Sequence, residues 1–260
     1  MELFDSQNND VAVLGNIVIR RPRNTEATTG VLREASVLPR VRSLLTLPLP
    51  DVQTVVVGDE TLAVHSLLPG EPLESVEALS NQTKEHLAAQ LGTFLKSLHE
   101  IDSVVLDTVE LPFIDQRWWA KFLYKAEQLI FPKLSSTTAE LLQSQVRSHI
   151  VQLPNLPFVL RHGDFGSGNI LWDGKKDIVG IIDFGSIGWG DPGWDVAGVF
   201  ACYGRTFATQ LLLTYPAAES LLERAVFYKR MFALMEAVFG VENADGEALE
   251  DGLAALRKVV

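Results

Sequence analysis

Most of the side chains that could take part in a chemical reaction lie within residues 161–197. Asp164 and Asn169 stand at the two ends of a loop that contains two glycines, and Asp183 follows the next apolar stretch. Glycine lets such a loop fold back tightly, and a hairpin in the residues after it would return Asp183 towards Asn169. Two carboxylates and one carboxamide oxygen would then converge. Oxygen ligands of this kind suit Mg²⁺, which proteins hold with one or two carboxylates and substrate phosphates.

The order of these three residues also has a chemical meaning. An Asp, an Asn five positions later and an Asp before Phe-Gly is the order in which kinases arrange a catalytic base and their metal ligands. Each short piece alone is common in turns. The joint spacing, with apolar residues between the polar ones, favours phosphoryl transfer.

Strands and helices must position these residues. Apolar and β-branched runs separated by Gly-Asn and Gly-Asp predict two hairpins, at residues 11–19 and 52–68, and helical spacing of apolar residues lies between them. A further hairpin, at residues 169–184, would carry Asn169 and Asp183. The helices are expected at residues 26–45, 83–99, 115–131, 136–152 and 217–240.

A strong breaker, Pro-Gly-Glu-Pro at residues 69–72, separates the strand-rich part of the chain from the helical part. We place the boundary between two lobes here. Residues 1–68 would form a small β-rich lobe, and residues 69–260 would form a mostly helical lobe.

The pattern over residues 162–197, with Gly-Asp-Pro at 190–192 and Asp-Val-Ala at 195–197, resembles the aminoglycoside phosphotransferase and choline kinase-like family. The resemblance implies an α+β fold of the protein kinase-like, bilobal type. It also implies Mg²⁺ as the cofactor and ATP or GTP as the phosphate donor.

The resemblance assigns a role to each polar residue of this segment. Asp164 would be the catalytic base that accepts the proton of the substrate hydroxyl, and Asn169 and Asp183 would hold the Mg²⁺ ions. His162 would support the loop, and Asp195 would brace it from the following helix.

The same resemblance identifies nucleotide-binding residues in the first lobe. Arg20 occupies the strand position where the family usually carries a lysine that grips the α- and β-phosphates, and Glu34 matches the glutamate that pairs with it. Arginine is not a neutral replacement for lysine, so this departure bears on nucleotide affinity. Backbone groups near Ser66 and Leu68 fall where the family's lobe-connecting hinge contacts the purine.

A second departure concerns the start of the chain. The family's first strand and phosphate-covering loop should precede Val11, but only ten residues stand there, and residues 4–9 contain no glycine. The first lobe is therefore expected to be shortened, with residues 4–9 as the remnant of the loop. An incomplete loop leaves a pseudoenzyme as an alternative, a kinase-shaped binding protein with little or no catalysis.

Composition limits the function classes. The chain has 260 residues, 47% hydrophobic and 21% charged, which is typical of a globular protein. Its 22 basic and 33 acidic residues give a net charge of −11, which disfavours a nucleic-acid partner and suits a cationic small molecule. No apolar run approaches the roughly 20 residues of a membrane span, and the first residues do not resemble a secretion signal. We therefore expect a cytoplasmic protein without a membrane partner, and the sequence leaves its oligomeric state open.

Other residues receive plainer interpretations. Cys202, the single cysteine, is expected to be a small buried hydrophobe, and the histidines outside the dense segment show no metal-ligand spacing. Acidic residues near the end of the chain form a solvated face or, as the resemblance implies, a site for substrate amino groups. These residues are Glu242, Asp245, Glu247, Glu250 and Asp251.

The sequence thus predicts an enzyme that phosphorylates a hydroxyl group of a small molecule. By the resemblance, the favoured acceptor is an aminoglycoside or a related aminosugar. A macrolide, or a metabolic alcohol such as choline or homoserine, is the alternative acceptor.

Overall fold

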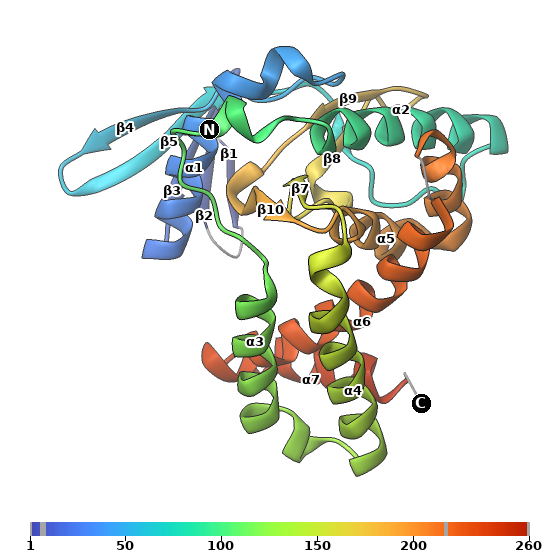
Figure 1. Cartoon of the computed structure of the whole chain (residues 1–260). Helices are drawn as coiled ribbons and strands as arrows, with labels where there is room; N and C mark the ends of the chain where they lie inside the picture. Colours follow the sequence, from blue (N-terminus) through green and yellow to red (C-terminus); the bar gives the residue numbers. More distant parts are fainter. Residues whose placement is uncertain (1, 6–8, 216–217, 259–260) are drawn as a thin grey trace.

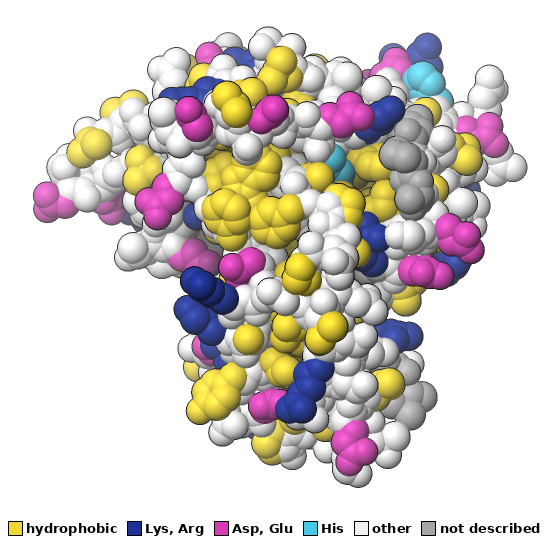
Figure 2. Space-filling model, in the orientation of Figure 1, with side chains coloured by type: hydrophobic (Ala, Val, Ile, Leu, Met, Phe, Trp, Pro, Cys, Tyr) yellow, Lys and Arg dark blue, Asp and Glu magenta, His cyan; other side chains and the backbone are white. Residues whose placement is uncertain are grey.

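The computed structural model describes residues 2–5, 9–215 and 218–258. It separates a small antiparallel sheet with one helix from a larger, mostly helical part (Figure 1). The α+β class expected from the sequence is confirmed. On the face in Figure 2, acidic and basic side chains are interspersed around a central apolar area, so the acidic excess is not concentrated there.

The sheet has five strands in the order β1-β2-β3-β5-β4, and each neighbouring pair is antiparallel. Gly15 and Gly58 stand in its two predicted hairpin turns with φ of 63° and 61°, a conformation that glycine adopts without a Cβ clash. Both predicted hairpins are confirmed. The strands are β1 Glu2–Asp5, β2 Asn9–Leu14, β3 Ile17–Pro22, β4 Gln53–Val57 and β5 Glu60–Ser66.

The first strand corrects one expectation about the start of the chain. Phe4 and Asp5 belong to β1, where they pair with Val11 and Asp10 of β2, so they are strand residues and not a loop remnant. The segment between the two strands, residues 6–8, lies outside the described residues. A shortened phosphate-covering loop therefore stays a prediction.

Helix α1, Thr25–Val41, follows the sheet's third strand and confirms most of the helix expected at residues 26–45. Asn24 caps it, because its side-chain oxygen accepts the N–H of Ala27 at 2.8 Å. Gly30 lets the helix approach the segment after Asp183, since a Cβ at this position would lie 3.3 Å from the carbonyl oxygen of Gly185.

In the helical part, α5 packs against both α2 and α6, α7 packs along α6, and α3 and α4 form a pair that extends away from the sheet (Figure 1). Side-chain oxygens of Ser80, Asp115, Ser135 and Asp245 cap α2, α3, α4 and α7. The predicted helices are confirmed. Helix α7 was not expected, and α5 was expected only as the helix that follows the dense segment, without bounds. None of the helices that the structure describes is long and apolar enough to cross a membrane. Their bounds are α2 Asn81–His99, α3 Gln116–Leu129, α4 Ser136–Gln152, α5 Gly193–Leu211, α6 Ala218–Glu242 and α7 Gly246–Arg257.

Two short sheets carry the chemically dense segment. In one, strand β7, Val159–Arg161, pairs with β10, Gly188–Gly190. In the other, β8, Ile170–Trp172, lies between β6, Glu71–Pro72, and β9, Ile178–Ile181. The hairpin of β8 and β9 confirms the one predicted from the sequence. The division into lobes at residues 1–68 and 69–260 stays a prediction.

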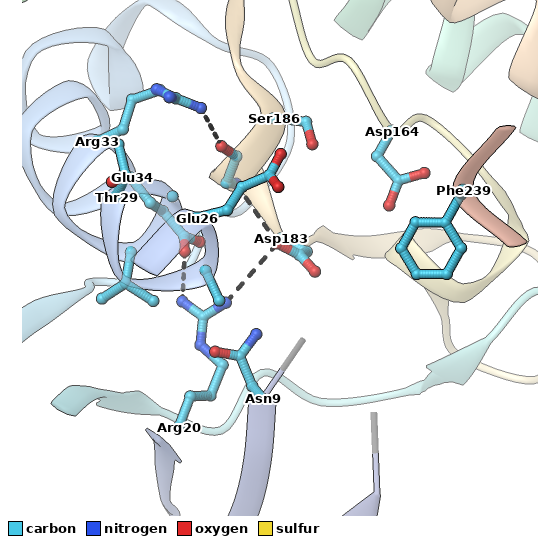
Figure 3. Close-up of a pocket in the computed structure, with 14 residues that line it drawn as sticks. Asn9, Arg20, Glu26, Thr29, Arg33, Glu34, Asp164, Asp183, Ser186 and Phe239 are labelled. Carbon is cyan, nitrogen blue, oxygen red and sulfur yellow. Dashed lines mark hydrogen bonds and ion pairs between the residues drawn. The ribbon is translucent and has the colours of Figure 1, made fainter. Parts of the chain in front are cut away.

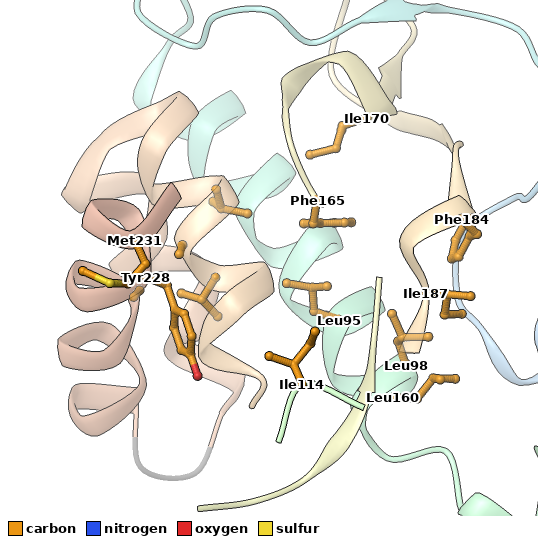
Figure 4. Close-up of a cluster of buried hydrophobic side chains, with 14 of the residues drawn as sticks. Leu95, Leu98, Ile114, Leu160, Phe165, Ile170, Phe184, Ile187, Tyr228 and Met231 are labelled. Carbon is orange, nitrogen blue, oxygen red and sulfur yellow. The ribbon is translucent and has the colours of Figure 1, made fainter. Parts of the chain in front are cut away.

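A buried apolar cluster holds these short strands against α2 (Figure 4). Phe94 of α2 stacks on Phe165 of the chemically dense segment, with ring centroids 5.8 Å apart. The dense segment therefore rests on a packed core and not on a solvated surface. Other members of the cluster are Leu95, Leu98, Leu160, Ile170, Phe184 and Ile187.

Candidate active site

A cavity of about 430 Å³ lies between α1 and the segments that carry Asp164 and Asp183 (Figure 3). Arg20 and Glu34 line it together with these two aspartates, so four residues predicted from the sequence meet at one cavity. Phe239 of α6 lies beside Asp164 on the opposite side from Arg20.

Arg20 and Glu34 form a buried ion pair at the floor of the cavity. Alternation along β3 turns Arg20 inwards, and its guanidinium donates a hydrogen bond to Glu34 Oε2. The Glu34 side chain is fully buried, and its other oxygen accepts the backbone N–H of Phe184 at 3.4 Å. Burial raises the pKa of Glu34 above its ordinary value, although the charge of Arg20 opposes the rise.

Asp183 faces the cavity from a left-handed backbone conformation, with φ 61° and ψ 69°. Aspartate is among the few residues other than glycine that tolerate this region. One carboxylate oxygen accepts the N–H of Gly185 at 3.4 Å and lies 3.8 Å from a guanidinium nitrogen of Arg20. Arg20 therefore lies between two carboxylates, one buried and one that is 45% exposed.

The loop between Asp164 and Asn169 folds back as the glycine spacing predicted. The N–H of Gly166 donates to the carbonyl of Asp164 at 3.0 Å, and the N–H of Asn169 donates to the carbonyl of Gly166 at 3.0 Å. The side-chain amide of Asn169 donates to the backbone carbonyl of Asp164 at 2.8 Å and to its Oδ2 at 2.9 Å. The N–H of Ile182 donates to the carbonyl of Asn169 at 3.0 Å, which brings Asp183 beside the loop.

Asp195, at the start of α5, braces this loop from behind. Its fully buried carboxylate accepts the backbone N–H of His162 at 2.8 Å and that of Gly163 at 2.9 Å. His99 bonds the same carboxylate at 3.1 Å. Burial alone would raise the pKa of Asp195, but hydrogen bonds and the charge of His99 hold the pKa below its ordinary value.

His162 connects the loop that carries Asp164 to the strand before Asp183. Its Nδ1 accepts the N–H of Asp164 at 3.2 Å, so its Nε2 carries the proton and donates to the carbonyl of Ile182 at 3.1 Å. The ring is completely buried. The supporting position predicted for His162 is thus a bridge between the loop and the strand before Asp183.

Ser66 and Leu68 do not belong to this cavity. Ser66 ends β5, and neither residue is among those that line the cavity. Their contact with a purine ring stays a prediction.

Sequence reasoning missed several residues that touch the site, and three of them hydrogen-bond to it. His99 bonds Asp195, Arg33 of α1 donates to the carbonyl of Gly185 at 2.5 Å, and Trp194 donates to the carbonyl of Gly163 at 2.9 Å. All three partners lie far away in the chain, so no local spacing marks them.

Cys202 also differs from its expectation. It is exposed, and its sulfur accepts the N–H of Ser167 in the loop at 3.3 Å. The sulfur therefore contacts the catalytic segment instead of filling a core position.

The donor set fits Mg²⁺. Asp183 offers a half-exposed carboxylate, and Asn169 offers an amide oxygen whose amide nitrogen is already bound to Asp164. Within the described ranges, no group of three His, Cys, Asp or Glu residues could enclose a metal ion by itself. A site that is completed by waters and substrate phosphates is the usual arrangement for Mg²⁺.

Comparisons with known proteins agree with this geometry. A family model described as "Phosphotransferase enzyme family" matches residues 5–228. Viomycin phosphotransferase of Streptomyces vinaceus is 30% identical over 198 residues, which are 75% of this chain and 69% of that protein.

Solved structures show the same fold. The GDP complex of wild-type aminoglycoside 2'-phosphotransferase-IIIa matches with a TM-score of 0.89 at 18% identity, over 98% of this chain and 90% of that one. Macrolide 2'-phosphotransferase MphH of Brachybacterium faecium matches with a TM-score of 0.75 at 19% identity, over 98% and 91%. The protein kinase-like fold is therefore confirmed. With a family match that spans most of its length, this chain belongs to the phosphotransferase enzyme family, and it is a small-molecule kinase with an alcohol group as its acceptor.

Proposed function

We propose that this enzyme transfers the γ-phosphoryl group of ATP or GTP to a hydroxyl of an aminoglycoside or a related aminosugar, with Mg²⁺ as its cofactor. One observation carries the proposal: Asp164 and Asp183 line the same cavity as the Arg20–Glu34 ion pair. A base, a metal ligand and a cationic phosphate contact are thus available around one space. The proposal also places the enzyme in the cytoplasm, where nucleoside triphosphates are supplied.

In this mechanism Asp164 accepts the proton of the acceptor hydroxyl. As the hydroxyl oxygen forms a bond to the γ-phosphorus, the bond from phosphorus to the β-γ bridging oxygen breaks and the nucleoside diphosphate leaves. Asn169 holds one carboxylate oxygen of Asp164 through its amide, which leaves the other oxygen available for the hydroxyl. His162 and Asp195 keep the loop in place, so the base is positioned before the substrate binds.

Asn169 and Asp183 would hold Mg²⁺ through their side-chain oxygens. The ion would neutralise charge on the β- and γ-phosphates when bound. Arg20 lies 3.8 Å from Asp183, close enough for its guanidinium to contact the α- and β-phosphates from the same side. Backbone groups near Ser66 and Leu68 would contact the purine. Two of the similar solved structures are a GDP complex and an ADP-bound form, which supports a nucleotide donor.

An acidic pair on the last two helices supports a cationic acceptor. Glu236 lies one turn before Phe239 on α6, and partial burial and the nearby charge of Asp251 raise its pKa. Two carboxylates that disfavour each other's charge would gain from a bound ammonium group. Of the other late acidic residues, Asp245 caps α7 and Glu242 lies 2.7 Å from Lys125, so these two have structural roles.

The relatives also define the alternatives. One similar protein is a viomycin phosphotransferase, and one similar structure is a macrolide 2'-phosphotransferase. Viomycin and a macrolide therefore belong in the same test. Choline and homoserine, the other acceptors that the sequence resemblance implies, are tested with them.

The decisive experiment is a transfer screen with Mg²⁺ and either ATP or GTP. The acceptors are kanamycin, gentamicin, streptomycin, viomycin, a macrolide, choline and homoserine, and the readout is the mass gained on phosphorylation. Asp164→Asn is the matched control, because it preserves shape and one acceptor oxygen but cannot take a proton. We expect an aminoglycoside to be phosphorylated, and we expect the variant to lose about 10²–10⁴ in kcat.

Two results would contradict the proposal. Transfer to choline, homoserine or the macrolide alone would leave the mechanism standing and replace the acceptor. Nucleotide binding without transfer to any acceptor of the screen would overturn the proposed acceptor class.

A further inference from the structure

The peptide group between Gly163 and Asp164 is hydrogen-bonded at both ends. Its carbonyl, on Gly163, accepts the indole N–H of Trp194 at 2.9 Å, and its N–H, on Asp164, donates to Nδ1 of His162 at 3.2 Å. A peptide group is planar, so two bonds on opposite edges fix the rotation of the whole plane. The Cα of Asp164 belongs to that plane, so its position is fixed. The bonds from the Asn169 amide to the Asp164 carbonyl and Oδ2 then set the direction of the side chain.

Gly163, the residue before Asp164, is the reason why this peptide plane needs to be restrained. Gly163 has φ of 90°, a region that residues with a Cβ rarely adopt. Its N–H donates to Asp195 at 2.9 Å, but glycine itself offers little resistance to rotation about its own backbone bonds. The carbonyl bond from Trp194 therefore restrains the freedom that glycine introduces directly before the base.

Trp194 is itself held in place by neighbours. Its ring centroid lies 5.5 Å from that of Tyr228 and 5.2 Å from that of Phe232, both on α6. The guanidinium of Arg161 also stands 4.6 Å from the ring centroid of Trp194. An indole packed in this way presents its N–H at a fixed point.

We propose that Trp194 is a positioning residue for phosphoryl transfer, and that it acts by locking the Gly163–Asp164 peptide plane through its indole N–H. The inference rests on the proposed role of Asp164 as the base. It gives Trp194 no contact with nucleotide or acceptor. Loss of its N–H should therefore lower kcat and leave nucleotide binding unchanged.

The same aromatic cluster contains a matched control. The ring of Trp119 lies 6.4 Å from that of Trp194 and is completely buried, yet in the described part of the chain its indole N–H has no hydrogen-bond partner. Trp119→Phe and Trp194→Phe thus remove the same atoms from one cluster, and only the second removes a hydrogen bond.

A third variant restores the donor. When histidine replaces tryptophan, its Nε2 occupies the ring position of the indole nitrogen, and the Nε2–H tautomer donates from that place. Trp194→His therefore keeps the N–H and loses the six-membered ring, whereas Trp194→Phe loses the N–H and keeps a six-membered ring.

The test measures kcat and nucleotide KM for the three variants, with the acceptor that gives the highest turnover in the screen. We expect Trp194→Phe to lower kcat about 10- to 100-fold with nucleotide KM within about two-fold. Trp119→Phe should stay within about two-fold of wild type, because its N–H makes no bond. Trp194→His should recover most of the lost turnover. Thermal melting checks that each variant is folded at the assay temperature.

Equal kcat for Trp194→Phe and Trp119→Phe would overturn the inference, as would a Trp194→His variant no faster than Trp194→Phe. If Trp194→Phe does not fold, Trp194→His is compared with Trp119→Phe instead. A kcat of Trp194→His more than about ten-fold below that of Trp119→Phe would then overturn the inference. Asp164→Asn, assayed alongside, keeps the two proposals apart. Wild-type turnover in that variant removes the role of Asp164, whereas the comparisons above remove only that of Trp194.

Discussion

The two walls of the cavity are held in different ways. The wall with Asp164 is fixed by neutral and charged hydrogen bonds to Asp195, His162 and Trp194, and it stands on a packed aromatic core. The wall with Arg20 belongs to a sheet whose edge strand β4 is exposed along its whole length, and its inner contacts are ionic.

This difference suits the tasks that we propose for the two walls. Proton transfer needs a base held within a fraction of an ångström, and hydrogen bonds supported by packing supply that precision. A triphosphate needs a positive charge beside it, and the guanidinium of Arg20, held between two carboxylates, supplies one. Damage to the first wall should therefore appear in kcat, and damage to the second wall in nucleotide KM.

The largest effect should follow from Gly163→Ala. A Cβ here would lie 2.2 Å from the carbonyl oxygen of Ser186, and the backbone has φ of 90°. Strain and the clash should destabilise the fold by at least about 2–3 kcal/mol and lower kcat by about 10²-fold or more. Gly168→Ala is the control in the same loop, because a Cβ there meets nothing within 4 Å. Urea unfolding and turnover measure both variants, and similar losses in the two would refute the argument from backbone geometry.

Arg20→Ala should break the other wall. It leaves the Glu34 carboxylate buried without its partner, which costs about 3 kcal/mol of folding free energy, and it should raise nucleotide KM with a smaller change in kcat. Arg20→Lys keeps a charge beside Glu34 and should retain most of the affinity. Arg21→Ala is the surface control, since that exposed residue pairs with Asp10 at 2.6 Å and should contribute less than about 1 kcal/mol. A normal KM in Arg20→Ala would show that Arg20 does not contact the nucleotide.

The same variant should show a pH dependence. Burial already raises the pKa of Glu34 above its ordinary value of 4.5, and without Arg20 the pKa should rise further. A folded state that binds a proton more tightly than the unfolded chain loses stability as pH rises. The destabilisation of Arg20→Ala should therefore be greater at about pH 8 than at about pH 5. Urea unfolding at the two pH values measures this, and equal destabilisation at both would contradict the buried position of Glu34.

A smaller effect on the fold, and a clear one on binding, should follow from Asp183→Asn. Asparagine tolerates the left-handed backbone at this position, so the variant tests the charge without adding strain. We expect affinity for the Mg²⁺–nucleotide complex to fall at least about ten-fold, because the remaining oxygens cannot offset the metal's charge. Asn169→Ala should weaken binding less, since it removes a neutral ligand. Calorimetry with and without Mg²⁺ decides, and unchanged Mg²⁺-dependent affinity in Asp183→Asn would remove the metal-ligand assignment.

The smallest effect should come from the outer edge of the sheet. Val56 on β4 is 71% exposed, so Val56→Thr keeps β-branching and removes little buried surface. Its melting midpoint should correspond to a change within about 0.5 kcal/mol, and both kinetic constants should stay normal. A marked rise in nucleotide KM would show that this edge is tied to the nucleotide wall.

Much of this molecule could be predicted from local pattern. Turn residues at Gly15 and Gly58 marked the hairpins, and apolar spacing marked the long helices. The convergence of Asp164, Asn169 and Asp183 also followed from local facts, because a short loop and one hairpin connect them. Helix α7 was not predicted because its acidic residues resemble a solvated face, although one of them, Asp245, is its N-cap.

The contacts that hold the site could not be predicted in this way. His99 reaches Asp195 across 96 positions and Arg33 reaches Gly185 across 152. Nothing next to either residue in the sequence distinguishes it from a surface cation. Such partners are fixed by how helices pack on the catalytic loop, and packing has no local signature.

The side-chain amide of Asn169 has two chemically different ends, a nitrogen that donates and an oxygen that accepts. Its amide nitrogen is bound to Asp164 at 2.8 and 2.9 Å, so its oxygen is the end that remains for another partner. A carboxylate at position 169 would have no hydrogen to donate, and two acids at such a distance would share one proton and titrate as a coupled pair. The neutral carboxamide therefore separates the group that accepts a proton from the position where a cation would bind. It keeps a second negative charge away from the base and still presents an oxygen on its other side.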